Sequence, residues 1–249
     1  MRVLGIIPAR YASSRFPGKP LVDIKGKTMI QRVYEGACAC DGLDEVVVAT
    51  DHQEIYSCVK DFAGKVEMTS PNHMSGTDRC AEVLDLYAKR NLHFDIVINI
   101  QGDEPFICVE QIEALRECFS NQNTDIATLV KKIDDSEELH NPNNVKVVFS
   151  KNRKALYFSR QAIPFMRNEE QKTQWISKHN YFKHIGVYAY RADVLREVTK
   201  LSISTLEKSE SLEQLRWLEN DYEIVVAETS IEAISVDTPE DLEKLLKNI

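Results

Sequence analysis

The chain has 249 residues, of which 43% are hydrophobic and 28% charged, and its formal net charge at pH 7 is −8. A chain of this length is expected to form one α/β domain, with at most a smaller appended lobe. The acidic balance argues against a nucleic-acid-binding surface, but it does not exclude an anionic substrate, because the field inside a single cleft decides that.

Targeting and redox signals point to the cytoplasm. No apolar run is long enough to span a bilayer, and the amino-terminal residues enter strand-like sequence without a signal peptide. The six cysteines include no C-x-x-C pair, which favours buried free thiols over disulfides or zinc ligands. We therefore expect a cytoplasmic protein without a membrane partner.

Apolar strand-like runs alternate with helical patterns through the first half of the chain. The run Val3–Ile7 comes first, and Ile96–Ile100 is continuously apolar, as a central parallel strand should be. This alternation predicts an α/β fold with a doubly wound, mostly parallel sheet and ligands at the carboxyl ends of its strands. The other predicted elements are helices at 29–40, 51–63, 77–89 and 109–119 and strands at 45–50, 65–68 and 126–131.

The pattern changes near residue 141. The strand-like runs that follow have no long helices between them, which favours antiparallel pairing. We expect residues 141–220, approximately, to form a smaller mixed α+β lobe within a single domain that covers residues 1–249. The predicted strands are 145–149, 155–159, 183–190, 223–227 and 233–236, and the predicted helices are 193–200, 211–220 and one that begins at Thr238-Pro239.

The first loop concentrates positive charge after the first strand. Arg10, Arg15 and Lys19 lie close together between prolines, with hydroxyls such as that of Ser13 among them. A stiff loop of this kind can hold a polyphosphate, although a solvated basic loop would contain the same residue types. It is not a Walker motif, because Pro20 replaces the metal-binding Ser or Thr, and no G-x-G-x-x-G fingerprint is present.

A second group of polar residues follows the apolar run that ends at Ile100. Asp103 is placed to hold a hard divalent cation, which prefers carboxylate, phosphate and water oxygens. Gln101 can hydrogen-bond a neutral group, and Glu104, which precedes a proline, can simply shape the turn. Asp237 is a second candidate carboxylate that would complete a magnesium site if it lay beside Asp103. Taken alone, each aspartate also fits an ordinary turn or helix cap.

A third group precedes the helix predicted at 77–89. Ser75 and Gly76 offer backbone N–H groups and little bulk, which suits a nucleobase or a phosphate at a helix start. Arg79 adds a fixed positive charge. An ordinary capped helix with a surface arginine is the structural alternative for this group.

The fourth group lies in the second half of the chain and contains Arg160, His184, Tyr188, Glu210 and Gln214. Arginine and histidine suit a carboxylate, whereas glutamate, glutamine and tyrosine suit hydroxyls. Together they would fit an acidic, polyhydroxylated sugar. Each residue taken singly also has a structural interpretation, such as a hydrogen-bonded core histidine.

The order of these motifs resembles the 3-deoxy-manno-octulosonate (Kdo) cytidylyltransferase family of nucleotide-sugar-forming enzymes. The first matched block, residues 6–21, carries I-P-A-R-x-x-S-x-R-x-P-G-K-P-L at residues 7–21, and similar blocks follow in the family's order nearly to the end of the chain. The other matched blocks are 48–51, 73–79, 99–105, 141–148, 155–160, 184–188, 212–216 and 236–242.

That resemblance implies the fold of nucleotide-diphospho-sugar transferases and a Mg²⁺-dependent transfer of CMP from CTP to Kdo, which feeds lipopolysaccharide synthesis. It also implies a homodimer that uses the second lobe, and no nucleic-acid partner. Another acidic sugar, such as 8-amino-Kdo or sialic acid, and a non-catalytic sugar-nucleotide-binding role remain open alternatives.

The family pattern also implies roles for individual residues. CTP would contact Arg10, Ser13, Lys19, Ser75, Gly76 and Arg79, with Arg15 a further substrate-binding candidate. Magnesium would bind Asp103 and Asp237. The sugar acid would contact Gln101, Arg160, His184, Tyr188, Glu210 and Gln214. The catalytic candidates among them are Arg10, Lys19, Asp103 and Asp237.

Overall fold

The structure is a computed structural model that describes residues 1–12, 16–231 and 234–248. The chain divides into two compact units. Unit 1 contains Met1–Glu113, Ala189–Thr199 and Ala233–Ile249, and unit 2 contains Ala114–Tyr188 and Lys200–Glu232.

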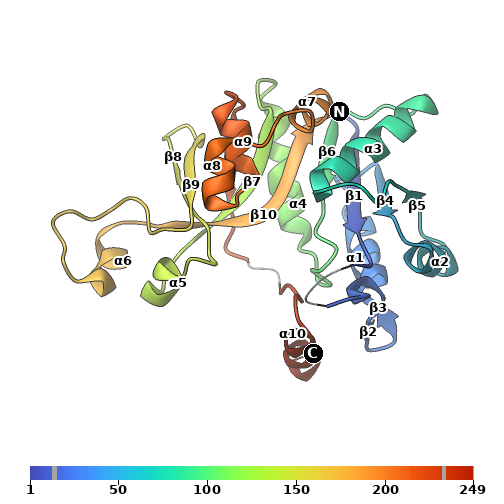
Figure 1. Cartoon of the computed structure of the whole chain (residues 1–249), viewed down its shortest axis with the longest axis horizontal. Helices are drawn as coiled ribbons and strands as arrows, with labels where there is room; N and C mark the ends of the chain where they lie inside the picture. Colours follow the sequence, from blue (N-terminus) through green and yellow to red (C-terminus); the bar gives the residue numbers. More distant parts are fainter. Residues whose placement is uncertain (13–15, 232–233, 249) are drawn as a thin grey trace. The chain divides into compact units, whose positions relative to one another are not determined.

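The sheet of unit 1 has parallel strands in the order β6, β1, β4, β5, which lie side by side in Figure 1. Ile6 in β1 pairs with Val47 in β4 on one side and with Asn99 in β6 on the other. Apolar side chains on both faces of β1 are completely buried, as expected for a parallel strand covered by helices. The strands are β6 (Ile96–Asn99), β1 (Val3–Ala9), β4 (Glu45–Thr50) and β5 (Val66–Met68).

The helices of unit 1 begin where their sequence provides caps. The Thr28 hydroxyl accepts a hydrogen bond from the Gln31 N–H at the start of α1, and Ser75 forms a capping box with Asp78 at the start of α3. Helix α3 packs on β1, β6 and α7. The elements are α1 (Met29–Cys38), α2 (Gln53–Asp61), α3 (Gly76–Lys89), α7 (Ala192–Val198), α10 (Pro239–Asn248), the 3-10 helix η1 (Lys19–Leu21) and the hairpin β2 (Asp23–Ile24) with β3 (Lys27–Thr28). Helix α4 (Val109–Glu117) belongs partly to each unit.

Unit 2 has a mixed sheet. Strand β11 (Ile224–Glu228) is parallel to β7 (Ile126–Lys132), which neighbours β10 (Phe182–Arg191). Residues 189–191 of β10 belong to unit 1. Strands β8 (Lys146–Phe149) and β9 (Ala155–Ser159) form the antiparallel hairpin that Figure 1 shows in yellow. The remaining elements are α5 (Ser136–His140), α6 (Trp175–Lys178), α8 (Thr205–Glu210), α9 (Gln214–Glu219) and the 3-10 helices η2 (Cys118–Ser120) and η3 (Lys172–Gln174).

The expected α/β class with a mostly parallel sheet and a smaller antiparallel part is confirmed. Among the described residues, every helix is too short or too polar to cross a bilayer. The strand predicted at 233–236 is wrong for its described residues, 234–236, because the Val236 N–H donates to the Asp103 carbonyl at 3.0 Å rather than to a sheet. The helix predicted at 211–220 is shorter in the structure, which has α9 at Gln214–Glu219, because Ser211 adopts a left-handed conformation with φ 52° at the end of the preceding helix, α8.

The six cysteines are free, as expected, but they are not all buried. Cys40 and Cys80 are buried, whereas Cys38 is exposed at the carboxyl end of α1. The expectation of burial is therefore wrong for Cys38, and it holds only in part for Cys58, Cys108 and Cys118, which are half-buried.

Candidate active site

In unit 1, Lys19 joins the two aspartates that the sequence singled out. Its Nζ lies 2.8 Å from Asp103 Oδ2 and 3.1 Å from Asp237 Oδ1. Lys19 opens η1, Asp103 follows β6, and Asp237 precedes α10, so three separate segments supply the cluster. The Lys19 side chain is only 14% exposed, so both ion pairs are partly shielded from solvent.

The backbone around Asp103 leaves little space. A Cβ atom added at Gly102 would lie 2.8 Å from the Pro8 carbonyl oxygen, a distance at which the backbone would have to shift. The turn therefore packs directly on the end of β1, and glycine is needed there for close approach. On its other side, the Asp103 carbonyl accepts the Val236 N–H, which fixes the segment that carries Asp237.

In the first loop, a backbone hydrogen bond joins Gly18 to Tyr11 just before Lys19. Gly18 has φ 70°, a conformation that favours glycine, and its N–H donates to the Tyr11 carbonyl at 3.0 Å. The Tyr11 ring stacks on His52 with a centroid distance of 4.1 Å, a contact that nothing in the loop sequence predicted. Arg10 is exposed. The predicted site residues Ser13 and Arg15 lie outside the described residues.

The two carboxylates have the chemistry of a site for a hard divalent cation. Their oxygens converge on one cationic nitrogen, that of Lys19, and carboxylate oxygens are the protein ligands that magnesium prefers. The described residues contain no group of three or more His, Cys, Asp or Glu side chains able to hold a metal. Substrate and water oxygens would therefore have to complete the coordination of a metal at Asp103 and Asp237.

Glu104 is the acidic neighbour of this cluster. Burial, followed by the charge of Asp103, raises the pKa of its carboxyl to about 7. The sequence analysis gave Glu104 only a turn-shaping role. The Glu104 carboxyl is therefore harder to ionise than an exposed glutamate, because it is buried and next to the Asp103 carboxylate.

The start of α3 carries the next three predicted residues. The Ser75 hydroxyl accepts the Asp78 N–H at 3.1 Å, and the Asp78 carboxylate accepts the Ser75 N–H at 3.2 Å. A Cβ atom added at Gly76 would lie 3.5 Å from both Pro8 and Asn99. The helix start is therefore closely packed against the ends of β1 and β6.

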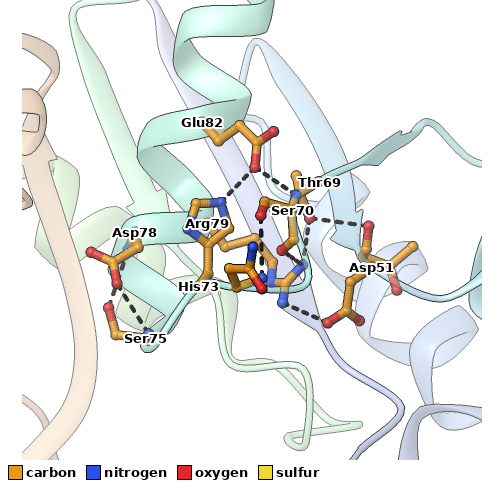
Figure 2. A network of polar contacts seen from close by, with 10 residues as sticks. Asp51, Thr69, Ser70, His73, Ser75, Asp78, Arg79 and Glu82 are labelled. Carbon is orange, nitrogen blue, oxygen red and sulfur yellow. Dashed lines mark hydrogen bonds and ion pairs between the residues drawn. The ribbon is translucent and has the colours of Figure 1, made fainter.

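Arg79 is buried rather than presented at the surface, with 4% of its area exposed. Figure 2 shows its guanidinium between Asp51 and the Thr69–Ser70 segment. Nη2 donates to Asp51 Oδ2 at 3.0 Å, and Nη1 donates to the Thr69 hydroxyl and, at 3.5 Å, to the Ser70 carbonyl. In this structure Arg79 stabilises the ends of β4 and β5; a contact with CTP stays a prediction.

One turn further along α3, Glu82 holds the same loop from the other side (Figure 2). Its Oε2 accepts the Ser70 N–H at 2.8 Å and lies 2.5 Å from His73 Nε2. Burial acts to raise the pKa of Glu82, but these hydrogen bonds and the charges of His73 and Arg79 together lower it. Sequence reasoning missed Glu82, although its spacing of three from Arg79 placed both on one helix face.

In unit 2, the predicted residues Arg160 and Glu210 are in direct contact. Glu210 accepts the Arg160 backbone N–H at 2.9 Å and the Ser159 hydroxyl at 2.7 Å. The Arg160 Nε donates to the Glu210 carbonyl at 2.7 Å. The end of β9 is thereby tied to the end of α8.

His184 lies among aromatic rings of unit 2. Phe158 and Tyr188 each have ring centroids 5.2 Å from that of His184, and Tyr188 packs edge-on against Trp217. Burial lowers the pKa of His184 to about 3, so its imidazole is neutral near pH 7. A neutral imidazole can exchange hydrogen bonds with hydroxyls but supplies no positive charge for a carboxylate.

The remaining sugar candidates are divided between the units. Gln214 is buried at the start of α9 in unit 2, and Gln101 lies in the turn after β6 in unit 1. The described nucleotide and metal candidates thus belong to unit 1, and most sugar candidates belong to unit 2.

Lys146 is a buried residue that sequence reasoning overlooked. Its side chain is completely buried, and Nζ donates to the carbonyls of Asn141 at 2.9 Å, Asn144 at 2.6 Å and Arg160 at 2.5 Å. Burial lowers the pKa of Lys146 to about 8. The available signal was a lysine inside an otherwise apolar strand, where a charged side chain needs buried partners.

Comparison with solved structures defines the class of protein. A structure of CMP:2-keto-3-deoxy-manno-octonic acid synthetase complexed with CTP matches with a TM-score of 0.90 and 43% identity, and covers 100% of this chain and 98% of that one. The 4-diphosphocytidyl-2C-methyl-D-erythritol synthase of Anaerococcus prevotii, at 14% identity, shares only the fold, with a TM-score of 0.64. A family model described as cytidylyltransferase matches residues 4–229. The class is therefore that of the cytidylyltransferases.

The curated relatives narrow this class. The 3-deoxy-manno-octulosonate cytidylyltransferase of Parabacteroides distasonis is 57% identical over 250 residues, which cover 99% of this chain and 97% of that protein. The protein of the same name from Phocaeicola vulgatus is 57% identical over 245 residues, which cover 97% and 95%. The chain belongs to the 3-deoxy-manno-octulosonate cytidylyltransferase family.

Proposed function

We propose that the protein transfers CMP from CTP to the anomeric hydroxyl of Kdo and releases pyrophosphate, a step that supplies lipopolysaccharide synthesis. Membership of the family, at 57% identity over nearly the whole chain, is the observation that carries this proposal. The cluster of Lys19, Asp103 and Asp237 supports it, because a cation and two carboxylates are suited to a metal–triphosphate substrate.

The proposed cofactor is Mg²⁺, held by Asp103 and Asp237. When bound, the metal would polarise the phosphate and make the sugar hydroxyl more acidic. The proposed CTP contacts are Arg10, Ser13, Lys19, Ser75, Gly76 and Arg79, with Arg15 a further candidate in the same loop.

The reaction needs no nucleophile from the protein. The anomeric oxygen of the sugar attacks the α-phosphorus of CTP in line with the leaving pyrophosphate; the bond to the pyrophosphate oxygen breaks, and the hydroxyl proton is lost to solvent. Arg10 and Lys19 stabilise the charge that builds on pyrophosphate. Correct positioning of both substrates can supply about 7–11 kcal/mol of barrier reduction, more than one general base provides. We therefore assign no catalytic base.

The proposed sugar-binding set consists mainly of unit 2 residues. Arg160 supplies the positive charge for the sugar carboxylate, and the neutral His184 exchanges a hydrogen bond with a sugar hydroxyl. The full set is Gln101, Arg160, His184, Tyr188, Glu210 and Gln214.

The decisive experiment measures pyrophosphate release from CTP with Kdo, 8-amino-Kdo or sialic acid offered in turn. Fastest turnover with Kdo supports the proposal, and fastest turnover with another sugar reassigns the substrate. Tight binding of CTP and sugar without pyrophosphate release would identify a non-catalytic binding protein. Omission of Mg²⁺ in a parallel series tests the cofactor.

A cytoplasmic homodimer completes the proposal. It is supported by the resemblance to the family, in which the second lobe forms the dimer contact. Light scattering coupled to gel filtration tests it, because a mass near twice the 28.5 kDa of one chain is expected.

A further inference from the structure

We propose that Thr128 is a positioning residue that holds His184 in the tautomer with the proton on Nε2, so that Nδ1 presents a lone pair to a donor of the bound sugar. The tautomer follows from contacts within unit 2. The identity of the ligand as a sugar rests on the proposed function.

Thr128 is a completely buried residue in the middle of β7. Its Oγ1 lies 3.0 Å from His184 Nε2, 2.8 Å from the Val187 carbonyl oxygen and 3.2 Å from the Ile185 carbonyl oxygen. Val187 and Ile185 are two residues apart on β10, so their carbonyls point to the same side of that strand. The hydroxyl thus meets two carbonyl acceptors and one ring nitrogen.

The contacts of Thr128 favour His184 Nε2 as a hydrogen-bond donor. A hydroxyl has one hydrogen and two lone pairs, and a carbonyl oxygen can only accept. The closest contact, at 2.8 Å, therefore assigns the hydroxyl hydrogen to the Val187 carbonyl. The lone pairs of Oγ1 then face His184 Nε2, which must donate. If Oγ1 donated its hydrogen to Nε2 instead, its lone pairs would face both carbonyl oxygens. Neither carbonyl, which can only accept, would then receive a hydrogen bond from Thr128.

Because His184 is neutral, the position of its single ring proton decides which ring nitrogen can accept a hydrogen bond. Because burial holds the imidazole neutral near pH 7, the ring carries one N–H and one acceptor nitrogen. With the proton on Nε2, the acceptor is Nδ1. Within residues 1–12, 16–231 and 234–248, the polar contact of the ring is the one to Thr128, and its other close neighbours are the rings of Phe158 and Tyr188.

The tautomer sets the polarity of the contact that a ligand can make. An Nδ1 lone pair accepts a hydrogen bond from a hydroxyl, whereas an Nδ1–H would require an acceptor such as a carboxylate oxygen. Thr128 therefore acts through His184 to select a sugar hydroxyl at this position. The sequence offers one cue, since Thr128 is the only hydroxyl-bearing residue in the apolar run 126–130.

Nitrogen NMR tests the tautomer without any turnover. In a histidine-labelled sample of the full chain at pH 7, two-bond proton–nitrogen correlations separate the Nε2–H and Nδ1–H forms. The His184 signals are identified by their loss in His184→Gln. We expect the Nε2–H pattern in the wild-type protein. An Nδ1–H pattern, or a protonated ring, would overturn the proposal, and this measurement needs no variant of Thr128 to fold.

Variants test the functional consequence. In Thr128→Val, His184 should lose its preference for the Nε2–H tautomer. KM for Kdo should rise by about ten-fold while KM for CTP is unchanged, since one hydrogen bond to the sugar is disturbed. Thr128→Ser keeps the hydroxyl and should retain both wild-type properties. Thr124→Val is the matched control, because Thr124 is also buried and donates to the Cys118 carbonyl at 2.8 Å, without a contact to His184.

The outcomes separate the two proposals. A folded Thr128→Val protein with the wild-type tautomer and an unchanged KM for Kdo would refute the role of Thr128 while the enzyme remained active. Equal losses in Thr128→Val and Thr124→Val would also refute it, since they would indicate a general packing defect. A wild-type protein that releases no pyrophosphate from CTP and Kdo would refute the proposed function and leave the NMR result standing.

Discussion

The ammonium of Lys19 lies 2.8 Å from the Asp103 carboxylate, and Asp237 approaches the same nitrogen from the opposite end of the chain at 3.1 Å. A lysine of the first loop therefore offsets part of the negative charge of the two carboxylates proposed to hold magnesium. A metal bound to both would have to displace this ammonium, which could then move to the phosphates. Metal binding and nucleotide binding are expected to be coupled for that reason.

The first prediction concerns Lys19→Met. Without the competing ammonium, the free enzyme should bind Mn²⁺, a spectroscopic substitute for Mg²⁺, about ten-fold more tightly, which corresponds to ~1.4 kcal/mol. Electron paramagnetic resonance measures free Mn²⁺ directly. Lys27→Met is the matched control, because Lys27 forms an exposed ion pair with Glu35 at 2.5 Å. Equal Mn²⁺ affinity in wild type and Lys19→Met would show that the lysine does not compete with the metal.

The second prediction concerns Asp103→Asn. An amide keeps the shape of the side chain but loses the charge that attracts Mg²⁺ and pairs with Lys19. We expect turnover to fall by at least about 100-fold, with an unchanged circular dichroism spectrum. Pyrophosphate release gives the rate. Asp134→Asn, at an exposed position paired with Lys132, should behave like the wild type. Near-normal turnover in Asp103→Asn would remove Asp103 from the metal site.

The third prediction concerns Glu82, which holds Ser70 and His73 ahead of the start of α3. Glu82→Ala removes both hydrogen bonds, so the loop before Ser75 should lose its fixed conformation. If that loop positions CTP, KM for CTP should rise about ten-fold while KM for Kdo stays the same.

Glu82→Gln is the informative partner variant. The amide oxygen can still accept the Ser70 N–H, so this variant should retain most of the CTP affinity. Identical defects in the alanine and glutamine variants would show that the charge of Glu82, and not its hold on the Ser70 backbone, is what matters.

Local sequence signals were sufficient for much of unit 1. The apolar run Val3–Ile7 and the cap at Thr238-Pro239 depend on neighbouring residues, and the structure has β1 and α10 there. The strand predicted before Asp237 failed because the Val236 N–H has a distant partner, the Asp103 carbonyl. No local pattern encodes that pairing.

In unit 2, too, a local feature could be predicted from the sequence and a long-range contact could not. The capping box of Ser204 and Glu207 was present as a local signature, and sequence reasoning simply passed over α8. By contrast, the contact between Thr128 and His184 joins residues 56 apart in the chain. Such tertiary contacts become visible only when the strands are placed beside one another.

The fourth prediction concerns the pH dependence of stability through Lys146. Burial lowers its pKa to about 8 in the folded protein from an ordinary value of 10.5. Between these values the unfolded chain binds a proton that the folded chain does not, so the free energy of unfolding should rise with pH. The difference in pKa allows a contribution of up to about 3 kcal/mol across this window.

Comparison with Lys146→Met isolates this contribution, because other titrating groups are common to both proteins. The variant should be less stable at pH 8, since it leaves the carbonyls of Asn141, Asn144 and Arg160 without their donor. From pH 8 to pH 10, the wild type should gain stability relative to the variant in urea unfolding. Parallel curves for the two proteins would mean that the three carbonyls hold Lys146 charged in the fold and offset the effect of burial on its pKa.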